Sequence, residues 1–465
     1  MNESLFNAQD VIAIDDLRDH ISGEVILPDD PDYDSARAAF NLTVDQHPIL
    51  VVMPLNADDV FEAVCYAAER SLPIAVQATG HGVVIRADGA LLINTSRMTG
   101  ITIDPAARTA RVEAGATWGQ VLAAAQAHGL APLLGSSPTV GAVGYTLGGG
   151  FGWLGRKFGL ASDAVLSFEV VTAECEQLTV SPEENPDLFW GLRGGGGGLA
   201  VVTAMTVRLF PVSMVYGGQL VYPAESAAAV LRRWRDWLPT LPDEMTTSVK
   251  IMNLPDLEFI PAPMRGRTLV VLAGCHCGSL DEGATLIQSW RDWQQPIMDT
   301  FSPMSFADAA QISQDPENPV PGLSTGAWLR VLSDETVDTL VRYGTLQEGR
   351  APLIFVEIRH AGGAMSHPDR PSAFGHRDAE LLMDMVGMAP TPAARDALQA
   401  YYGRMMAALQ PALTGTVYMN FLEGDEKNTR VRDGFPPQTL ARLAALKTLY
   451  DPSNRLSRAM AIPVE

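Results

Sequence analysis

The chain has 465 residues, of which 47% are hydrophobic and 19% charged, and its formal net charge is −21. This length and composition predict a water-soluble globular protein of two or three ordinary domains. A polybasic surface for nucleic acid or for an anionic membrane is excluded, because lysine occurs only at positions 157, 250, 427 and 447.

The start of the chain, MNESLFNAQDVIAIDDL, has no basic segment followed by an apolar core. No apolar run elsewhere is long enough to span a bilayer. We therefore expect a cytoplasmic protein with neither a membrane nor a nucleic-acid partner. The cysteines, at positions 65, 175, 275 and 277, are too sparse for a disulfide scaffold, which favours a reducing compartment.

The region from 45 to 115 alternates short apolar runs with one amphipathic helix. This helix is predicted over 56–71, because apolar side chains repeat there at helical spacing, at Val60, Ala63, Val64 and Ala67. Either Asn56 or Asp58 can cap its first turn. Strands are predicted at 49–54, 74–82, 90–96 and 110–115. This order predicts a βαβ unit followed by further strands.

The next segments predict a helix at 117–129, a hairpin at 167–180, and a helix, a glycine loop and a strand over 185–211. From about 213 to 425 the pattern changes to longer strands separated by helices, which is typical of an α+β unit with an antiparallel sheet. Its strands are predicted at 250–254, 268–274, 352–360 and 415–421, and its main helices at 227–238 and 393–409. The tail, 436–457, predicts one helix and a turn.

The stretch from 135 to 163, GSSPTVGAVGYTLGGGFGWLGRKFGLASD, is unusually rich in glycine. Glycine lets the backbone adopt positive φ or approach a ligand closely, so this density suggests a bound partner. Residues 150–155 match GxGxxG, but neither a buried strand before them nor a helix after them is predicted, which disfavours a Rossmann dinucleotide site. No GxxxxGK[ST] motif occurs, so a P-loop is not supported.

Two further motifs have structural interpretations that we prefer. Cys275-His276-Cys277 lies in a predicted strand whose alternation places both thiols on one face, and no additional zinc ligands are near, so we expect no metal site. Gly322-Leu323-Ser324-Thr325-Gly326 matches the GxSxG motif of serine hydrolases. The preceding DPENPVP cannot form the buried strand that a nucleophile elbow requires.

Several motifs in order carry a family resemblance: DPDYDSARAAFN at 30–41, ATGHG at 78–82, the glycine stretch, NPDLFWGLRGGGGG at 185–198, YMNF at 418–421 and LYDPSNRLS at 449–457. In this order they resemble the berberine bridge enzyme-like FAD-linked oxidases of the vanillyl-alcohol oxidase superfamily. The resemblance implies an α+β fold with a two-subdomain, PCMH-type FAD-binding domain at 1–212. It also implies an inserted substrate domain at 213–425, with an antiparallel sheet covered by helices, and a return of 426–465 to the FAD-binding domain.

The ATGHG motif ends a predicted strand in small residues whose main-chain N–H groups can bind an anion: Ala78, Thr79, Gly80 and Gly82. In the family this loop holds the FAD diphosphate, and its histidine is bonded to the flavin 8α-methyl group. The resemblance therefore implies that His81 is the covalent anchor. The family often has arginine where this chain has Gln77, which is a small departure from the motif.

Many relatives read GxCPTVG and bond a second flavin carbon to that cysteine, whereas this chain has Ser137 there. Serine cannot form the thioether, so we expect FAD to be attached through His81 alone. Valine after Pro-Thr accompanies oxidases in the family, so Val140 implies an oxidase that reduces O₂ to hydrogen peroxide. The resemblance further implies contacts with the cofactor from Gly141, Gly144, Gly148, Gly149, Val202 and Asn420.

Catalysis in this family requires a hydride to leave the substrate for flavin N5 while a base removes a proton. The predicted strand at 415–421 places Tyr418 and Asn420 on one face, and the family's YxNY-like tyrosine reaches the reacting group, so Tyr418 is the first candidate for base or substrate anchor. Glu357, on one face of a strand with Phe355 and Arg359, is the second candidate base, although we prefer a salt bridge with Arg359 for it.

The expected function is therefore an FAD-dependent oxidase that acts on an alcohol, amine or phenolic carbon of a small molecule, a sugar or a secondary metabolite. The alternatives are a flavin-dependent dehydrogenase and a flavoprotein that sequesters a drug without turnover; a serine hydrolase is the least favoured. We expect a monomer or a homodimer whose partners are the substrate and O₂. The sequence does not identify the substrate.

Overall fold

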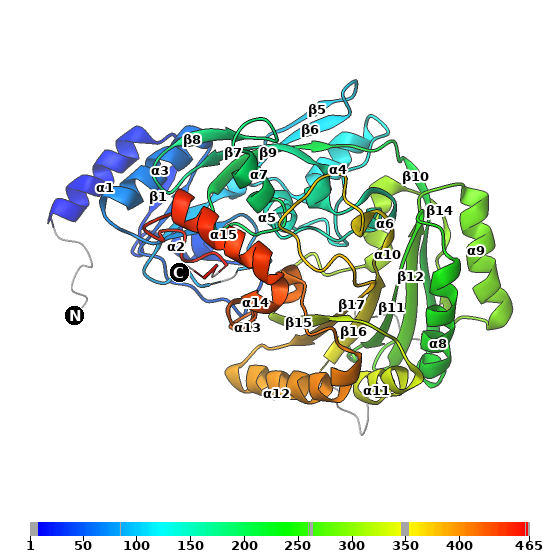
Figure 1. The fold of residues 1–465 in the computed structure, drawn as a ribbon. Helices are drawn as coiled ribbons and strands as arrows, with labels where there is room; N and C mark the ends of the chain where they lie inside the picture. Colours follow the sequence, from blue (N-terminus) through cyan, green and yellow to red (C-terminus); the bar gives the residue numbers. More distant parts are fainter. Residues whose placement is uncertain are drawn as a thin grey trace.

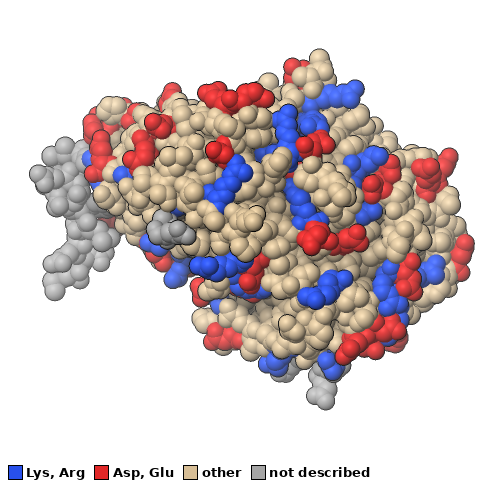
Figure 2. Space-filling model, viewed as in Figure 1, with Lys and Arg blue, Asp and Glu red and all other residues tan. Residues whose placement is uncertain are grey.

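The computed structural model describes residues 8–83, 85–258, 260, 264–345, 353–460 and 462–463. Three β-sheets build two halves, which lie at the upper left and lower right of Figure 1. Acidic and basic side chains are interspersed over the face in Figure 2, so the negative net charge of −21 is not gathered into one patch there. Among the described residues, no helix has the length and apolar character needed to cross a membrane.

The first sheet has the order β1-β2-β4-β3, in which β1 pairs antiparallel and the other neighbours pair parallel. The predicted helix of the βαβ unit forms between β2 and β3 as α3, and the Asn56 side chain caps it by accepting from Asp59 N. The elements are α1 (Ala8–His20), β1 (Glu24–Ile26), α2 (Tyr33–Arg37), β2 (Leu50–Met53), α3 (Ala57–Glu69), β3 (Ile74–Gln77) and β4 (Leu91–Asn94).

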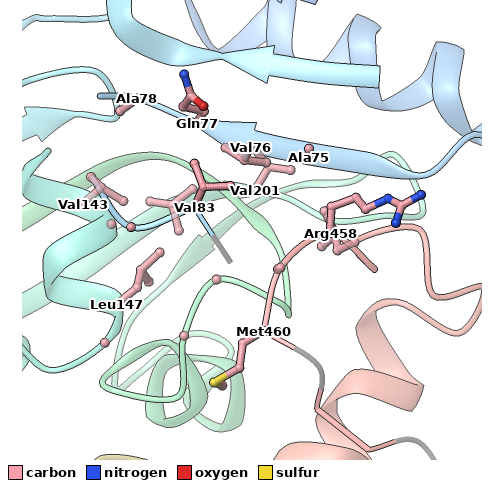
Figure 3. A pocket seen from close by; sticks show the side chains of 18 of the residues that line it. Ala75, Val76, Gln77, Ala78, Val83, Val143, Leu147, Val201, Arg458 and Met460 are labelled. Atoms are coloured by element: carbon pink, nitrogen blue, oxygen red, sulfur yellow. The ribbon is translucent and has the colours of Figure 1, made fainter. Parts of the chain in front are cut away.

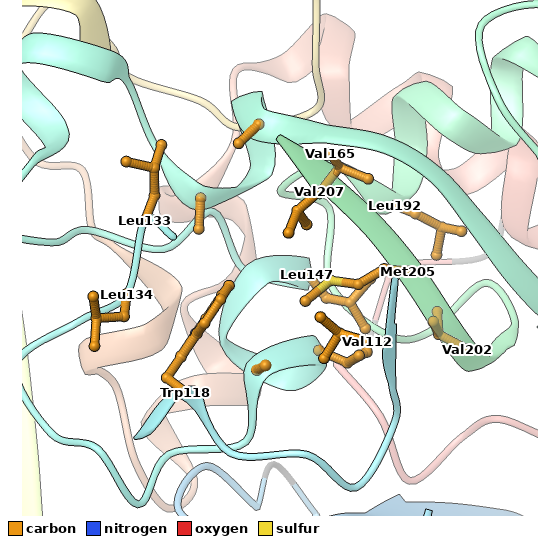
Figure 4. Packing of buried hydrophobic residues seen from close by; sticks show 14 of the residues in the cluster. Val112, Trp118, Leu133, Leu134, Leu147, Val165, Leu192, Val202, Met205 and Val207 are labelled. Atoms are coloured by element: carbon orange, nitrogen blue, oxygen red, sulfur yellow. The ribbon is translucent and has the colours of Figure 1, made fainter. Parts of the chain in front are cut away.

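The second sheet is antiparallel, with the order β5-β6-β9-β7-β8, and it contains the predicted hairpin as β7 and β8. Its elements are β5 (Ile101–Asp104), β6 (Thr109–Glu113), α4 (Trp118–Gln126), α5 (Ala142–Leu147), α6 (Gly155–Phe158), β7 (Val165–Val171), β8 (Gln177–Val180), α7 (Pro186–Leu192) and β9 (Val201–Arg208). Figure 4 shows its core, in which Trp118 of α4 and Leu147 of α5 pack near Met205 of β9. This close packing holds α5 rigidly, which matters because α5 forms a wall of the site described below.

The third sheet is antiparallel and eight-stranded, with the order β13-β10-β12-β11-β16-β17-β15 and β14 beside β10. Its strands are β10 (Met214–Pro223), β11 (Met245–Asn253), β12 (Thr268–His276), β13 (Met298–Asp299), β14 (Ser302–Ser305), β15 (Gly322–Leu329), β16 (Leu353–His360) and β17 (Leu381–Met388). The helices of this half are α8 (Ala227–Trp237), α9 (Leu280–Trp293), α10 (Ala310–Ser313), α11 (Asp334–Gly344) and α12 (Pro392–Leu409).

The two faces of the third sheet differ in chemistry. One face packs against α8, α9, α11 and α12, which line the right and lower margins of Figure 1, and its core includes Val249 and Met383. Because side chains alternate along a strand, the opposite face carries polar groups, among them Ser248, Glu357 and Arg359. This polar face of the third sheet therefore lies towards the space between the two halves of the molecule.

The end of the chain returns to the first half as α13 (Glu426–Thr429), α14 (Val431–Gly434) and α15 (Pro437–Tyr450). Figure 1 shows α15 beside α7. The buried ammonium group of Lys447 on α15 donates to Gly198 O at 2.9 Å, which ties the tail to the glycine run of 194–198.

Two local predictions are wrong. Residues 415–421 do not form a strand: Met419–Phe421 is a short 3₁₀ helix, because Phe421 N bonds to Tyr418 O while Val417 N bonds to Asp433 O instead of a sheet edge. Strand β12 ends at His276, so Cys277 lies beyond it and not on its face. The part of the chain that the structure describes holds no group of histidine, cysteine or carboxylate side chains that could bind a metal.

The two disfavoured motifs have the structures that we expected. Residues 150–155 follow α5 and a turn instead of a buried strand, and α6 is only four residues long. Ser324 lies within β15, where its hydroxyl donates to Phe421 O at 3.0 Å, so it is not at the sharp turn of a nucleophile elbow.

Candidate active site

Two adjoining cavities lie beside the loop that follows β3; the first lies within the first half of the molecule, and the second reaches the third sheet at Arg359. The first, which we call the tail cavity, has a volume of about 200 Å³ and is partly lined by the C-terminal residues Leu456, Arg458, Ala459 and Met460. Figure 3 shows Arg458 and Met460 on the C-terminal segment, across from Ala75 and Val76 of β3.

The second, which we call the tyrosine cavity, has a volume of about 340 Å³ and is lined by Tyr145 and Tyr418. Eight residues line both cavities: Val76, Gln77, Ala78, Gly82, Val83, Gly144, Asn420 and Lys427. The two cavities therefore join into one elongated site that runs from the C-terminal segment to the polar face of the third sheet.

Most of the residues predicted for cofactor and catalysis come together around this joined site. The tyrosine cavity is lined by Ala78, Thr79, Gly80, His81, Gly82, Ser137, Val140, Gly141, Gly144, Tyr418 and Asn420, and the tail cavity by Gly148 and Val202. Gly149 and Glu357 line neither cavity. Gly149 instead has a φ of +108° and packs against the Phe374 ring. Glycine is therefore required there for the backbone conformation and for the close contact with this ring.

The loop after β3 presents free main-chain donors to the site. Its carbonyl groups at Thr79 and Gly80 accept from Phe40 N and Asn41 N, at 3.0 and 3.3 Å. Its N–H groups from Thr79 to Gly82 donate to none of the residues that the structure describes. Successive unpaired N–H groups form a concave binding place for an anion, so this loop suits a phosphate group.

Lys427 places a buried positive charge beside the same loop. Its ammonium group donates to Gly82 O at 3.3 Å, and the side chain lines both cavities. Burial lowers the pKa of Lys427, and the neighbouring Glu423 counteracts this. Sequence reasoning did not single out Lys427; the available signal was its position just after the YMNF motif in a chain with four lysines.

Glycine at 144 and 148 keeps the wall of the site flat. A Cβ atom at Gly144 would have no atom within 4 Å and would project into both cavities. A Cβ atom at Gly148 would overlap the side-chain amide of Asn420. That amide is fixed, because its nitrogen donates to Tyr145 O and to the Tyr418 hydroxyl, each at 3.0 Å.

His81 lies at the rim of the loop in a mostly buried position. Its ring stacks on Phe40 with 3.6 Å between centroids and a 17° tilt, and its Nε2 lies 3.0 Å from Thr139 Oγ1. Burial lowers the pKa of His81 to about 4, so the imidazole is neutral at pH 7. A neutral imidazole retains a nitrogen lone pair, which is the form required for bonding to an electrophilic carbon.

The Tyr418 hydroxyl is held by two donors. Its oxygen accepts from Gly150 N and from Asn420 Nδ2, both at 3.0 Å, while the ring contacts Phe374 and Phe421. A hydroxyl has two acceptor positions and one proton, so the proton remains for a ligand in the cavity. Burial raises the pKa of Tyr418 to about 12, although these hydrogen bonds and the charge of Arg359 act in the opposite direction.

Glu357 forms the salt bridge that we preferred for it. Its carboxylate accepts from Ser248 Oγ at 2.7 Å and from Arg359 Nε at 2.8 Å, and Lys250 Nζ lies 3.7 Å away. Burial alone would raise its pKa, but the charges of Arg359 and Lys250 outweigh burial and lower the pKa to about 2. A carboxylate with so low a pKa binds protons weakly, which favours a positioning role for Glu357 over a role as base.

The residues that line the two cavities include Ser137 and no described cysteine. Ser137 Oγ lies 3.1 Å from Thr139 Oγ1 in the wall of the tyrosine cavity, and no described cysteine lines either cavity. Cys175 instead packs with the core of the first sheet.

Comparison with known proteins identifies the family. Residues 48–181 match the model of an FAD binding domain. The chain is 30% identical to (R)-6-hydroxynicotine oxidase of Paenarthrobacter nicotinovorans over 450 aligned residues. This alignment covers 94% of this chain and 95% of that protein. The chain belongs to the berberine bridge enzyme-like FAD-linked oxidoreductases. FAD is thus its cofactor, and it is an oxidoreductase.

Solved structures of similar proteins have the same fold. The 6-hydroxy-D-nicotine oxidase from Arthrobacter nicotinovorans matches with a TM-score of 0.83 and 26% identity, over 95% of this chain and 98% of that one. The xylooligosaccharide oxidase from Myceliophthora thermophila C1, solved with xylobiose, matches with a TM-score of 0.83 and 21% identity, over 97% and 99%. At that lower identity the likeness concerns the fold alone.

Proposed function

We propose that FAD lies along the joined tail and tyrosine cavities of this FAD-linked oxidoreductase. The free N–H groups of 79–82 and the ammonium group of Lys427 would hold its diphosphate, and Gly141, Gly144 and Gly148 would let the backbone lie flush against it. Val202 and the C-terminal residues would enclose its far end. We also propose that 1–212 and 426–465 form the FAD-binding domain and 213–425 the substrate domain, which the C-terminal lining of the tail cavity supports.

We propose a single covalent attachment, through His81. The neutral state of its imidazole and its place in the wall of the tyrosine cavity support this assignment. Serine at position 137, with no described cysteine in either cavity, supports the absence of a second bond.

The reaction that we propose is oxidation of a C–OH or C–NH group of a small molecule, for which bound FAD supplies the hydride acceptor. The observation that carries this proposal is the Tyr418 hydroxyl, whose oxygen is saturated by two N–H donors and whose proton is left for a ligand. Tyr418 would orient the substrate by donating that proton. To act as base it would first release the proton to solvent, and its phenolate would then take up the hydroxyl or amine proton of the substrate as the C–H bond breaks.

We propose O₂ as the electron acceptor and hydrogen peroxide as the product. Val140, a partly buried residue in the wall of the tyrosine cavity, has the short branched side chain that accompanies oxidases in the family.

The test is anaerobic mixing of the holoenzyme with panels of alcohols, amines, sugars and aromatic metabolites while flavin absorbance is followed. Compounds that bleach the flavin are then supplied with air, and peroxide is measured. Bleaching followed by stoichiometric peroxide supports an oxidase. Bleaching without peroxide identifies a dehydrogenase, and a protein that retains its flavin colour with every panel contradicts the proposed reaction.

A further inference from the structure

We propose that Arg359 binds a carboxylate of the substrate in the wall of the tyrosine cavity. The substrate class is then a small organic acid that carries an oxidisable C–OH or C–NH group near its carboxylate. The oxidisable group rests on the proposed function, whereas the carboxylate subsite rests on the surroundings of Arg359 alone.

The first observation is that a hydrogen bond from one nitrogen of the Arg359 guanidinium holds this side chain in place, while its other two nitrogens have no such bond among the described residues. It lies on the polar face of β16, and its Nε donates to Glu357 Oε2 at 2.8 Å. Glu357 is itself held by Ser248 at 2.7 Å. The guanidinium therefore has a fixed orientation before any ligand arrives, which reduces the entropy lost when a ligand binds.

The second observation is that the outer edge of this guanidinium is free. The Nη1 and Nη2 groups of Arg359 donate to none of the residues described here, and Glu357 is its only ion-pair partner within 4.0 Å among them. Two other acids act on it from farther away, Asp315 and Asp384. Burial raises the pKa of Asp384 well above its usual range, which disfavours its charged form and weakens it as a competing anion.

The third observation is a small cavity beside Arg359, lined in part by unpaired polar groups. It has a volume of about 10 Å³, room for a single oxygen-sized group, and is lined by Arg359, Trp153 and Thr246 among others. Trp153 Nε1 and Thr246 Oγ1 are buried and have no hydrogen-bond partner within the described structure. Arg359 also lines the tyrosine cavity, so the two cavities adjoin at its side chain.

The geometry favours a carboxylate over a neutral acceptor. The two terminal nitrogens of a guanidinium match the two oxygens of a carboxylate, and such paired charge-assisted bonds are stronger than neutral ones. The guanidinium carbon lies 4.9 Å from the centroid of the Phe421 ring, and the Tyr418 ring lies 5.0 Å from the same centroid. Arg359 and Tyr418 also line the same cavity, so a substrate held at Arg359 by its acid can contact Tyr418 with the rest of the molecule.

The test compares benzoate with benzamide, which has the same shape without the charge. Each is titrated into the oxidised holoenzyme, and binding is measured by calorimetry and by the change in flavin absorbance. We expect benzoate to bind at least tenfold more tightly than benzamide, and Arg359→Gln to abolish that difference. Arg359→Lys keeps the charge beside Glu357 but not the paired donors, so it should lose most of the preference.

Arg330→Gln is the matched control, because Arg330 is exposed beyond β15 and its loss removes the same charge. Equal binding of benzoate and benzamide by the wild type would overturn the proposal, as would an unchanged benzoate preference in Arg359→Gln. If Arg359→Gln does not retain flavin, Arg359→Lys decides, and full benzoate preference in it would overturn the paired-donor geometry. Because these titrations need no turnover, a benzoate preference in a protein that oxidises nothing would contradict the proposed reaction and leave the subsite standing.

Discussion

Replacing Tyr418 by phenylalanine removes the hydroxyl that we place against the substrate. With a pKa of about 12, the phenol of the ligand-free protein is protonated at neutral pH. Forming the phenolate at pH 7 would cost about 7 kcal/mol at about 1.4 kcal/mol per pKa difference of one. If Tyr418 is the base, the rate of anaerobic flavin reduction should therefore rise roughly tenfold for each pH increase of one below that pKa.

The assay is stopped-flow flavin reduction by a substrate from the panel, between pH 6 and pH 9. We expect Tyr418→Phe to lower the rate by roughly 10²-fold or more and to remove the pH slope. The variant also leaves Gly150 N without an acceptor and Asn420 Nδ2 with Tyr145 O alone, which should cost about 1–3 kcal/mol of folding free energy. An unchanged rate, or the same pH slope in a variant that is folded and flavinylated, would refute the role of Tyr418 as base.

Two further predictions concern the cavity wall and the polar sheet face. Val140→Leu should slow reoxidation of the reduced enzyme by O₂ in stopped flow without slowing its anaerobic reduction; reoxidation of the wild type no faster than that of free reduced flavin would instead indicate a dehydrogenase. Glu357→Gln leaves Arg359 and Lys250 without their buried counter-charge, so it should destabilise the fold by about 3–5 kcal/mol, whereas Asp334→Asn, at the exposed pairs with Arg232 and Arg235, should have a much smaller effect. Because the pKa of Glu357 is lowered from 4.5 to about 2, its contribution should be complete above pH 4.5 and disappear as the pH falls through about 2; a loss as small as that of Asp334→Asn would contradict the salt-bridge role.

Local rules predicted the elements whose signals lie within one segment. The apolar spacing and Asn56 cap of α3 and the hairpin of β7 and β8 form as expected, because their hydrogen bonds are made by neighbours in the chain. Residues 415–421 have strand-like composition, but Tyr418 bonds to Gly150, which lies 268 positions away. The tertiary contact decides the local conformation there, and no pattern within the segment reports it.

The site was predictable to the extent that motifs carry it. The ATGHG and glycine motifs led to the residues around the joined cavities, whereas Lys427 and the free edge of Arg359 depend on which distant segments of the chain meet in the fold. Glu357 illustrates the same limit: alternation placed it beside Arg359, but its partners Ser248 and Lys250 come from β11, about 110 residues earlier. Such pairings follow from sheet order, which one sequence does not specify.

The central claim, that FAD is bound in the joined cavities and bonded to His81 alone, is tested most directly by the mass of the acid-denatured protein and of its peptides. We predict that the denatured wild type carries the added mass of one FAD, that the flavin remains on the peptide containing His81, and that His81→Ala releases all flavin on denaturation. Release of flavin from the denatured wild type, or flavin on any other peptide, would contradict the claim.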